Sequence, residues 1–224
     1  FINGKLTGHG IKTWFNGDVY LGEFLDDEPD GFGILTSAYD GFSQGEWENG
    51  FLNGKGHKVK VNGDRYDGDF LNDLYHGNGT YTWTDGASYE GQWKDNQKHG
   101  RGKYTWPDGS NYDGEFLNDN QHGNGTYTWT DGEGYEGQWK NDQKHGRGKY
   151  IWSSGTTYEG EYLNNNKHGE GIFTWPDGSN YEGEFENGFL NGKGIFTLAD
   201  GTRSEVVYEN DELKSFKAIK IKKE

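Results

Sequence analysis

Residues 89–109 read Tyr-Glu-Gly-Gln-Trp-Lys-Asp-Asn-Gln-Lys-His-Gly-Arg-Gly-Lys-Tyr-Thr-Trp-Pro-Asp-Gly, and this pattern returns every 23 residues. One column of the repeat is tyrosine, with serine in two repeats: Tyr20, Ser43, Tyr66, Tyr89, Tyr112, Tyr135, Tyr158, Tyr181 and Ser204. An aromatic residue follows four positions later in every repeat, and two glycines precede the column by twelve and ten positions. A period of this length indicates an array in which each repeat packs on its neighbours.

Within one repeat the residues alternate between two faces, as β-strands require. From residue 89 to residue 94 the rings and the glycine share one face, and residues 100–106 alternate in the same way. Residues 107–109 supply turn chemistry for one connection, and the polar residues 94–98 are expected to form a second, looser connection. Each repeat is therefore predicted to be a β-hairpin.

Parity predicts how the strands pair, because residues opposite each other point to the same face. Parity allows Trp106 to lie opposite Tyr112. Tyr104 would then lie opposite Gly114. Each ring would cover the bare backbone of a glycine on the neighbouring strand, which explains why glycine occurs within these strands.

One strand departs from this pattern. Lys58 and Lys60 hold positions where other repeats carry rings, and Val59 and Val61 lie on the other face. The strand is therefore expected to have flipped either its polarity or its register.

The predicted fold is all-β: an elongated, twisted, single-layer antiparallel meander of about nine 23-residue hairpins. Residues 1–210 are assigned to the repeat array, which opens with an incomplete repeat at residues 1–17. Residues 211–224 are predicted to form a C-terminal capping strand with a basic tail. Its lysines, alternating with apolar residues, would discourage end-to-end stacking of sheets.

The composition excludes several classes of function. The 224 residues include 37 acidic and 22 basic side chains, a formal net charge of −15. Such a chain repels the phosphate backbone, so no nucleic-acid partner is expected. It also repels an anionic membrane unless the basic end, Lys214 to Lys223, makes the contact. With no cysteine, neither a disulfide nor a cysteine-containing zinc site can form.

A column of histidines invites a metal interpretation. Its members are His76, His99, His122, His145 and His168. Neighbouring members lie one hairpin apart, roughly 10 Å. Ligands that share a zinc ion must each place a nitrogen within about 2.1 Å of it. These histidines are therefore expected to be structural, and neither a metal nor a cofactor is predicted.

A column of carboxylates could be mistaken for catalytic groups: Glu23, Glu46, Asp69, Glu115, Glu161 and Glu184. They lie on the polar strand face, where solvated pairing with lysines such as Lys103 and Lys149 is expected. Paired acid chemistry needs two carboxylates in different environments, which an open sheet does not provide. No catalytic residue is predicted, and the chain is expected not to be an enzyme.

The sequence as a whole resembles the MORN repeat (membrane occupation and recognition nexus). The motifs are Tyr-Glu-Gly-Gln-Trp at 89–93, His-Gly-Arg-Gly-Lys-Tyr at 99–104 and Pro-Asp-Gly-Ser-Asn-Tyr at 107–112, and the resemblance extends from residue 1 to about 210. It implies a curved sheet whose aromatic and glycine face lines a groove, which in several members holds a helix or peptide of a partner. Members serve as cytoskeletal, ciliary and junctional scaffolds, so the resemblance implies a cytoplasmic protein of a cytoskeletal or ciliary assembly.

The aromatic face is the predicted partner-binding groove. Its candidate residues are Tyr81, Trp83, Tyr104, Trp106, Tyr112, Tyr127, Trp129, Tyr135, Tyr150, Trp152 and Trp175. A simpler interpretation is that these rings only cover the glycines. A single-layer sheet nevertheless leaves a long apolar patch, and such patches mark partner sites. The sequence thus predicts a non-enzymatic scaffold that binds a helix or extended peptide, and its negative flanks favour a basic partner.

Other interpretations stay open. The chain could be a phosphoinositide or membrane-binding module that uses its lysine tail, or a regulatory domain of a larger enzyme. Repeated aromatic residues with glycine also occur in sugar-binding repeats, although the spacing there differs. A homodimer through a terminal edge strand is a further expectation.

Overall fold

The computed structural model describes residues 4–219, and this part of the chain is all β, with nineteen strands and no helix. Its contacts divide it into two compact units: unit 1 runs to Pro107 and includes Phe116–Asp119, and unit 2 comprises Asp108–Glu115 and the chain from Asn120 onward. None of the described residues forms a helix long and apolar enough to cross a bilayer.

The strands of unit 1 are β1 (Gly8–Thr13), β2 (Val19–Leu25), β3 (Glu28–Ser37), β4 (Gly41–Glu48), β5 (Phe51–Val59), β6 (Arg65–Leu71), β7 (Leu74–Thr82), β8 (Ser88–Lys94) and β9 (Gln97–Thr105). β10 (Asn111–Leu117) contributes residues to both units. The strands of unit 2 are β11 (Asn120–Thr128), β12 (Gly134–Lys140), β13 (Gln143–Ile151), β14 (Thr157–Leu163), β15 (Asn166–Thr174), β16 (Asn180–Glu186), β17 (Phe189–Thr197), β18 (Arg203–Glu209) and β19 (Glu212–Ala218).

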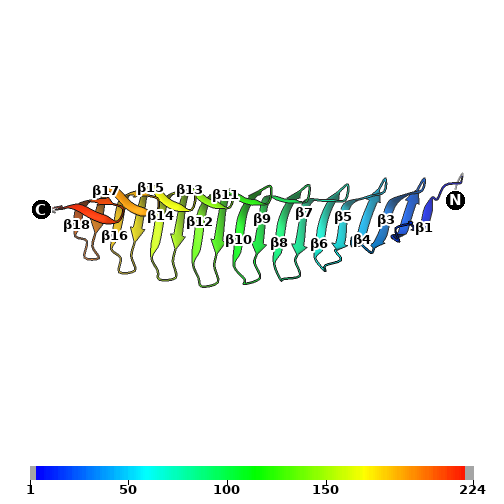
Figure 1. Cartoon of the computed structure of the whole chain (residues 1–224), viewed down its shortest axis with the longest axis horizontal. Coiled ribbons are helices and arrows are strands. Elements are labelled where there is room, and N and C mark those ends of the chain that lie inside the picture. Colours follow the sequence, from blue (N-terminus) through cyan, green and yellow to red (C-terminus); the bar gives the residue numbers. More distant parts are fainter. Residues whose placement is uncertain (1–3, 220–224) are drawn as a thin grey trace. The chain divides into compact units, whose positions relative to one another are not determined.

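In unit 1 the strands β1 to β9 follow one another in chain order, each antiparallel to the next (Figure 1). The strands β11 to β19 of unit 2 do the same. The predicted antiparallel meander of β-hairpin repeats is confirmed. The proposed boundary between an array and a capping strand at residue 211 stays a prediction, and part of the basic tail lies outside the described residues.

The tight connection of each repeat is a two-residue turn. Between β8 and β9, Asp95 and Asn96 both have positive φ, 50° and 66°, as a type I′ turn requires. Asn and Asp tolerate this conformation better than other residues with a side chain. The looser connection expected at residues 94–98 is therefore wrong. The longer connection is residues 83–87, where Gly86 has a φ of 96° and the Trp83 N–H donates to the Ala87 carbonyl over 3.0 Å.

Successive tight turns are joined by a pair of hydrogen bonds. The Tyr75 N–H donates to Oδ1 of Asn96 over 2.8 Å, and the Asn96 N–H donates to the Tyr75 carbonyl over 3.0 Å. In unit 2, Gln121 and Asp142 form the same pair, at 2.7 and 3.1 Å. The second turn residue thus satisfies main-chain groups of the preceding repeat: Asn and Asp satisfy two with a short side chain and the N–H, and the glycines Gly50 and Gly188 satisfy one with the N–H alone.

The predicted strand register is wrong by two residues. In the β7–β8 hairpin Tyr81 lies opposite Tyr89, and Gly79 lies opposite Gly91. Trp83 belongs to the five-residue connection, where its N–H and carbonyl close the turn. Trp106 likewise lies beyond the last residue of β9 and outside any strand. The rings still share one face of the sheet, as parity requires. Because the connection is five residues long, however, the first pair of the hairpin face involves tyrosine and not tryptophan.

The unusual strand β5 keeps the common register. Lys58 lies opposite Tyr66, and Gly56 lies opposite Gly68, as in the other hairpins. The register alternative for this strand is therefore wrong, and only its chemistry has changed. Lys58 stands where other repeats have tyrosine, and its ammonium lies 2.6 Å from the Asp40 carboxylate.

The core of each repeat is a tyrosine ring that lies on two glycines. Tyr135 has no exposed surface, and Gly137 lies opposite Gly148 in the β12–β13 pair. A Cβ atom on Gly137 would come 2.7 Å from the Tyr135 hydroxyl and 2.5 Å from the Gly148 Cα. The ring therefore occupies the space that side chains would need. For Gly137 the ring comes from two residues earlier on the same strand, whereas for Gly148 it comes from the neighbouring strand, as predicted.

The tyrosine hydroxyl also satisfies main chain at a β-bulge. The β12–β13 register shifts after Gly137, and Gly146 on the opposite strand has a φ of 60°, the left-handed conformation of a bulge glycine. The Tyr135 hydroxyl donates to the Gln138 carbonyl over 3.0 Å. The hydroxyl thus supplies a hydrogen-bond donor to the Gln138 carbonyl at the bulge.

The column of carboxylates caps the same bulge. Glu115 Oε1 accepts from the Asn124 N–H at 2.9 Å, and Glu184 accepts from the Lys193 N–H at 3.2 Å. The expected pairing of this column with lysines such as Lys149 is therefore not its main role. A hydrogen bond to the backbone follows from the bulge, which turns one N–H out of the strand ladder.

Edge-to-face contacts between rings join one repeat to the next. The Tyr135 ring lies 5.1 Å from Trp139 in its own repeat and 5.1 Å from Tyr162 in the next, at 88° and 84°. Tyr158 repeats the pattern with Tyr162 and Phe185. Aromatic pairs favour this geometry over face-to-face stacking. The buried rings therefore supply the contact between neighbouring hairpins.

Gly137→Ala should lower the free energy of unfolding by about 2 kcal/mol, because the new methyl group meets backbone and the Tyr135 hydroxyl. Gly134→Ala in the same strand is the control, since its Cβ would have only one neighbour, at 3.7 Å. Thermal unfolding followed by circular dichroism measures both. Equal melting temperatures for the two variants would contradict the packing of ring on glycine.

The buried tyrosines should make the fold sensitive to alkali. Burial raises the pKa of Tyr20 and Tyr181 from 10.0 to about 12. Between these values the unfolded chain releases protons that the folded chain retains, so stability is complete below about pH 10 and falls as pH rises toward 12. Most of the tyrosinate absorbance should appear only together with loss of the β-sheet signal. Ionisation of most of the 15 tyrosines near pH 10 with the sheet intact would contradict the prediction.

Candidate functional site

Two layers of aromatic side chains cover the inner face of the strands. The buried layer consists of the tyrosine column and the aromatic residues four positions later, such as Phe116 and Trp139. The second layer is half-buried and is called here the aromatic groove. Its residues are Trp83, Tyr104 and Trp106 in unit 1 and Tyr127, Trp129, Trp152 and Trp175 in unit 2.

The structure corrects part of the predicted site. Tyr112 and Tyr135 have no exposed surface, because each lies beneath the ring layer on its glycine pair. Both residues belong to the core, so the prediction that they contact a partner is wrong. Tyr81 and Tyr150 are 4% and 9% exposed, and each packs on the next tryptophan along the chain, with 4.5 Å between ring centroids. The other seven predicted residues retain exposed surface in the groove.

Within unit 2 the groove rings form a continuous row. Trp129 lies 4.2 Å from Tyr127 in its own hairpin and 5.4 Å from Tyr150 in the next, measured between centroids. Trp152 lies 4.5 Å from Tyr150 and 5.6 Å from Phe173. Each tryptophan therefore bridges two repeats, and its turn position presents part of the indole to solvent. The row is a wall of aromatic surface fixed on both sides by packing.

The opposite wall comes from the residue two positions after each tight turn. This column includes Leu52, Tyr75 and Lys98 in unit 1 and Gln121, Lys144, Lys167 and Leu190 in unit 2. Lys144 lies opposite Trp139, and Lys167 lies opposite Tyr162, so the column shares the face of the buried rings. Sequence reasoning missed it because its chemistry changes along the chain. Its 23-residue spacing was the available signal.

The lysines of this column lie over aromatic rings. The Lys144 ammonium is 4.5 Å from the centroid of Tyr150 and 5.4 Å from that of Tyr135. The Lys167 ammonium is 4.6 Å from the centroid of Phe173. Cation–π attraction offsets part of the lost hydration. Burial still lowers the pKa of both lysines, with Glu133 opposing the shift at Lys144 and Asp211 at Lys167.

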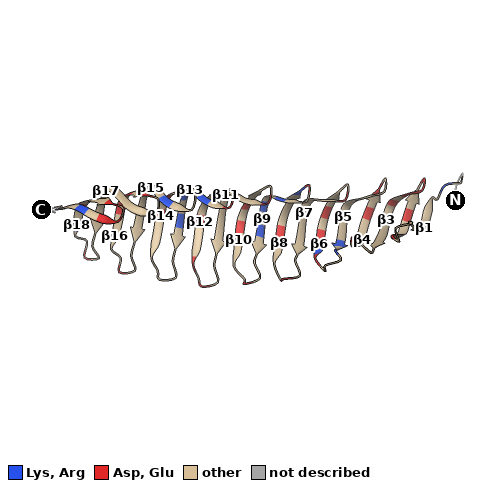
Figure 2. Cartoon of the chain, in the orientation of Figure 1, with Lys and Arg blue, Asp and Glu red and all other residues tan. Residues whose placement is uncertain are grey.

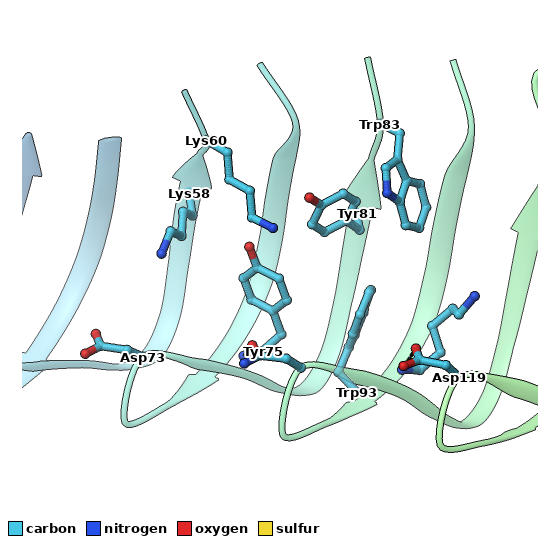
Figure 3. A pocket seen from close by; sticks show the side chains of 10 residues that line it. Lys58, Lys60, Asp73, Tyr75, Tyr81, Trp83, Trp93 and Asp119 are labelled. Carbon is cyan, nitrogen blue, oxygen red and sulfur yellow. Dashed lines mark hydrogen bonds between the residues drawn. The ribbon is translucent and has the colours of Figure 1, made fainter. Parts of the chain in front are cut away.

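Unit 1 holds a pocket of about 470 Å³ between the two walls. Figure 3 shows Tyr75 and Trp93 rising from the side of the tight turns, with Lys60, Tyr81 and Trp83 above them. The Lys60 ammonium is 5.2 Å from the centroid of Tyr81 and 5.8 Å from that of Tyr75. The pocket thus combines aromatic surface with an ammonium group, as the groove of unit 2 does.

Carboxylates at the edge of the pocket are engaged by backbone. Asp73 Oδ1 accepts from the Leu52 N–H at 2.8 Å, and Asp119 Oδ1 accepts from the Lys98 N–H at 2.9 Å. Burial raises the pKa of Asp73. These acidic groups belong to the hydrogen bonds between successive turns.

Several charged pairs lie on the outer face of the strands, and Figure 2 shows acidic and basic residues along the strands. Lys149 and Glu159 are 3.5 Å apart there, with about half or more of each side chain exposed. In the C-terminal strand β19, Lys217 pairs with Glu205 at 3.0 Å and Lys214 with Glu212 at 2.7 Å. The described part of the basic end is therefore matched by carboxylates of its own hairpin, and residues 220–224 lie outside the described part.

The histidine column is integrated into the bulges. The His99 carbonyl accepts from the Tyr89 hydroxyl at 3.4 Å, and its Nδ1 is buried without a hydrogen-bond partner. Across residues 4–219, no three His, Asp or Glu side chains lie close enough together to hold a metal ion.

Comparison with known proteins identifies the repeat. The family model described as "MORN repeat" matches nine consecutive segments: 1–19, 20–38, 44–65, 66–88, 89–111, 112–134, 135–157, 158–180 and 181–203. No curated protein matches the chain at a significant level.

Similar solved structures are remote. The TCP domain of Drosophila melanogaster SAS-4, in complex with a proline-rich motif of Ana2, is 13% identical with a TM-score of 0.45, over 69% of this chain and 84% of that one. The wild-type TCP10 domain of Danio rerio CPAP is 14% identical with a TM-score of 0.34, over 96% of both chains. Virginiamycin B lyase from Staphylococcus aureus is 10% identical with a TM-score of 0.17, over 99% and 87%. These TM-scores are too low to carry information about function.

The two ring layers should differ in what they contribute to stability. Tyr158→Ala removes a fully buried ring and should lower the free energy of unfolding by about 3–5 kcal/mol. Trp152→Ala removes a half-buried ring and should lower it by about 1–2 kcal/mol. Thermal unfolding compares the two variants. An equal loss would show that the groove rings serve the core and not a partner.

Proposed function

Because the chain belongs to the MORN-repeat family, with nine matching repeats, we propose that it is a non-enzymatic protein-interaction scaffold. It binds a helix or extended peptide of a partner protein along the aromatic groove. The observation that carries the proposal is the row of half-buried rings in unit 2, which spans successive hairpins and has an open side.

The chemistry of the row favours protein recognition. Tryptophan and tyrosine supply large rigid contact areas and dominate the binding energy of protein interfaces. The rings are already held by packing against one another, as Trp129 is between Tyr127 and Tyr150. Little side-chain entropy would then be lost when a partner binds.

The expectations about the partner's charge, the cellular assembly and the homodimer have less structural support than the groove itself. A basic partner was expected from the negative flanks of the groove, yet the charged side chains over the groove rings of unit 2 are Lys144 and Lys167. Membership of a cytoskeletal or ciliary assembly remains a prediction from the family, and a homodimer through a terminal edge remains a prediction from the sequence. In the described part of the basic end, Lys214 and Lys217 are paired within their own hairpin, so these two lysines do not favour the membrane alternative.

The test is a selection of random displayed peptides on the complete chain, followed by affinity measurement by fluorescence anisotropy. Combining Trp129→Ala, Trp152→Ala and Trp175→Ala should weaken binding of the selected peptides by more than tenfold, about 1.4 kcal/mol. The control combines Ile151→Ala, Leu163→Ala and Ile172→Ala, which truncate exposed residues of the outer strand face. Failure to select any peptide, or equal loss in both triple variants, would refute the proposal.

A further inference from the structure

Two ammonium groups of unit 2 lie in the groove without an acidic partner. Within the described chain, no carboxylate comes within 4.0 Å of the Lys144 or Lys167 ammonium. Each ammonium instead faces aromatic rings, of Tyr150 and of Phe173 respectively. The lysines of the outer strand face contrast with them, since Lys149 has Glu159 within 3.5 Å.

Burial makes these two charges costly for the free protein. The pKa of each lysine is lowered by loss of hydration, so the charged form is less stable there than in water. A carboxylate that reaches either ammonium would form a charge-assisted hydrogen bond in a partly dehydrated site. The aromatic walls would exclude water from that bond and strengthen it.

The acidic groups nearest this wall are already used. Asp142 Oδ1 accepts from the Gln121 N–H at 2.7 Å, and Asp211 Oδ1 accepts from the Leu190 N–H at 2.7 Å. Glu133, across the groove, accepts from the Tyr150 hydroxyl at 2.5 Å. These carboxylates are held by other hydrogen bonds and do not reach the two ammonium groups, so a carboxylate of a ligand can pair with them.

The repeat also sets the spacing of that charge. Lys144 and Lys167 occupy equivalent positions of adjacent hairpins, about 10 Å apart because each hairpin adds two strands. A polyproline II segment rises about 3.1 Å per residue with three residues per turn, so side chains three residues apart match this distance on one side. In an α-helix, side chains seven residues apart match it, at about 1.5 Å per residue.

We propose that the groove of unit 2 binds an acidic peptide segment, whose carboxylates pair with Lys144 and Lys167 while neighbouring apolar side chains pack on Trp129 and Trp152. The inference rests on the proposed function, since it specifies the charge of the peptide that the groove takes. The partner's charge is then opposite to that of the basic partner expected from the negative flanks of the groove.

Lys144→Gln combined with Lys167→Gln tests the inference, using peptides selected on the wild-type chain. The chain itself shows that glutamine fits this column, because Gln121 occupies it and is 8% exposed. The matched control is Lys140→Gln with Lys193→Gln, which removes the same charge from exposed positions of the outer face. Circular dichroism melts establish that both double variants fold.

The selected peptides should be enriched in Asp and Glu, spaced by three or seven residues. The groove variant should bind them about tenfold more weakly, and the control variant should bind within about twofold of wild type. Enrichment in Lys or Arg, no charge preference, or equal loss in both variants would overturn the inference. If those peptides still depend on the tryptophans, the proposed function survives that result. If no peptide is selected, the proposed function itself falls.

A second measurement separates a peptide from a lipid headgroup. The wild-type chain is sedimented with vesicles of phosphatidylcholine, with and without phosphatidylserine and phosphatidylinositol phosphates. We expect no binding that depends on Lys144 and Lys167. Vesicle binding that the groove variant loses and the control variant retains would assign these lysines to lipid phosphate and overturn the peptide inference.

Discussion

The structure depends on one contact, a tyrosine ring lying on a pair of glycines that face each other across two strands. At Gly137 and Gly148 the absence of side chains lets the Tyr135 ring reach the backbone, where its hydroxyl satisfies the Gln138 carbonyl. The ring then meets aromatic neighbours of its own repeat and the next. A sheet with little aliphatic core is thus held together by flat side chains on bare main chain. The same contact explains why the glycine pair cannot vary.

The second constraint is the hydrogen bonding between tight turns. Each turn ends on a residue in the left-handed conformation, and where that residue is Asn or Asp it bonds both main-chain groups of a residue in the preceding repeat, as Asn96 does with Tyr75. Ring contacts and turn contacts therefore act on different parts of the same pair of repeats. Stability in each unit arises from interactions between neighbours, which suits a repeat architecture.

The sequence predicted the class of fold because period 23 and period 2 are both visible in it. It could not predict the register, since parity alone does not tell whether Trp106 pairs with a residue of the next strand or lies in the connection between the strands. It misjudged residues 94–98 because Asp95 and Asn96 were interpreted as polar and not as residues that tolerate positive φ. In the site, alternation placed Tyr112 and Tyr135 with the exposed rings, since a pattern of faces does not show depth. Lys144 and Lys167 escaped notice because a column is easiest to see when its chemistry stays constant.

The bonds between turns have a consequence for how such a chain can change over time. At the position of Tyr75, Gln121 and Lys144 they use only the peptide group of that residue. The side chain takes no part in these bonds, which is why apolar, aromatic, amide and cationic groups all occupy the position, each packed against the neighbouring rings. Substitutions at this position could thus change the binding specificity of the groove one repeat at a time, while the hydrogen bonds between successive turns stay the same.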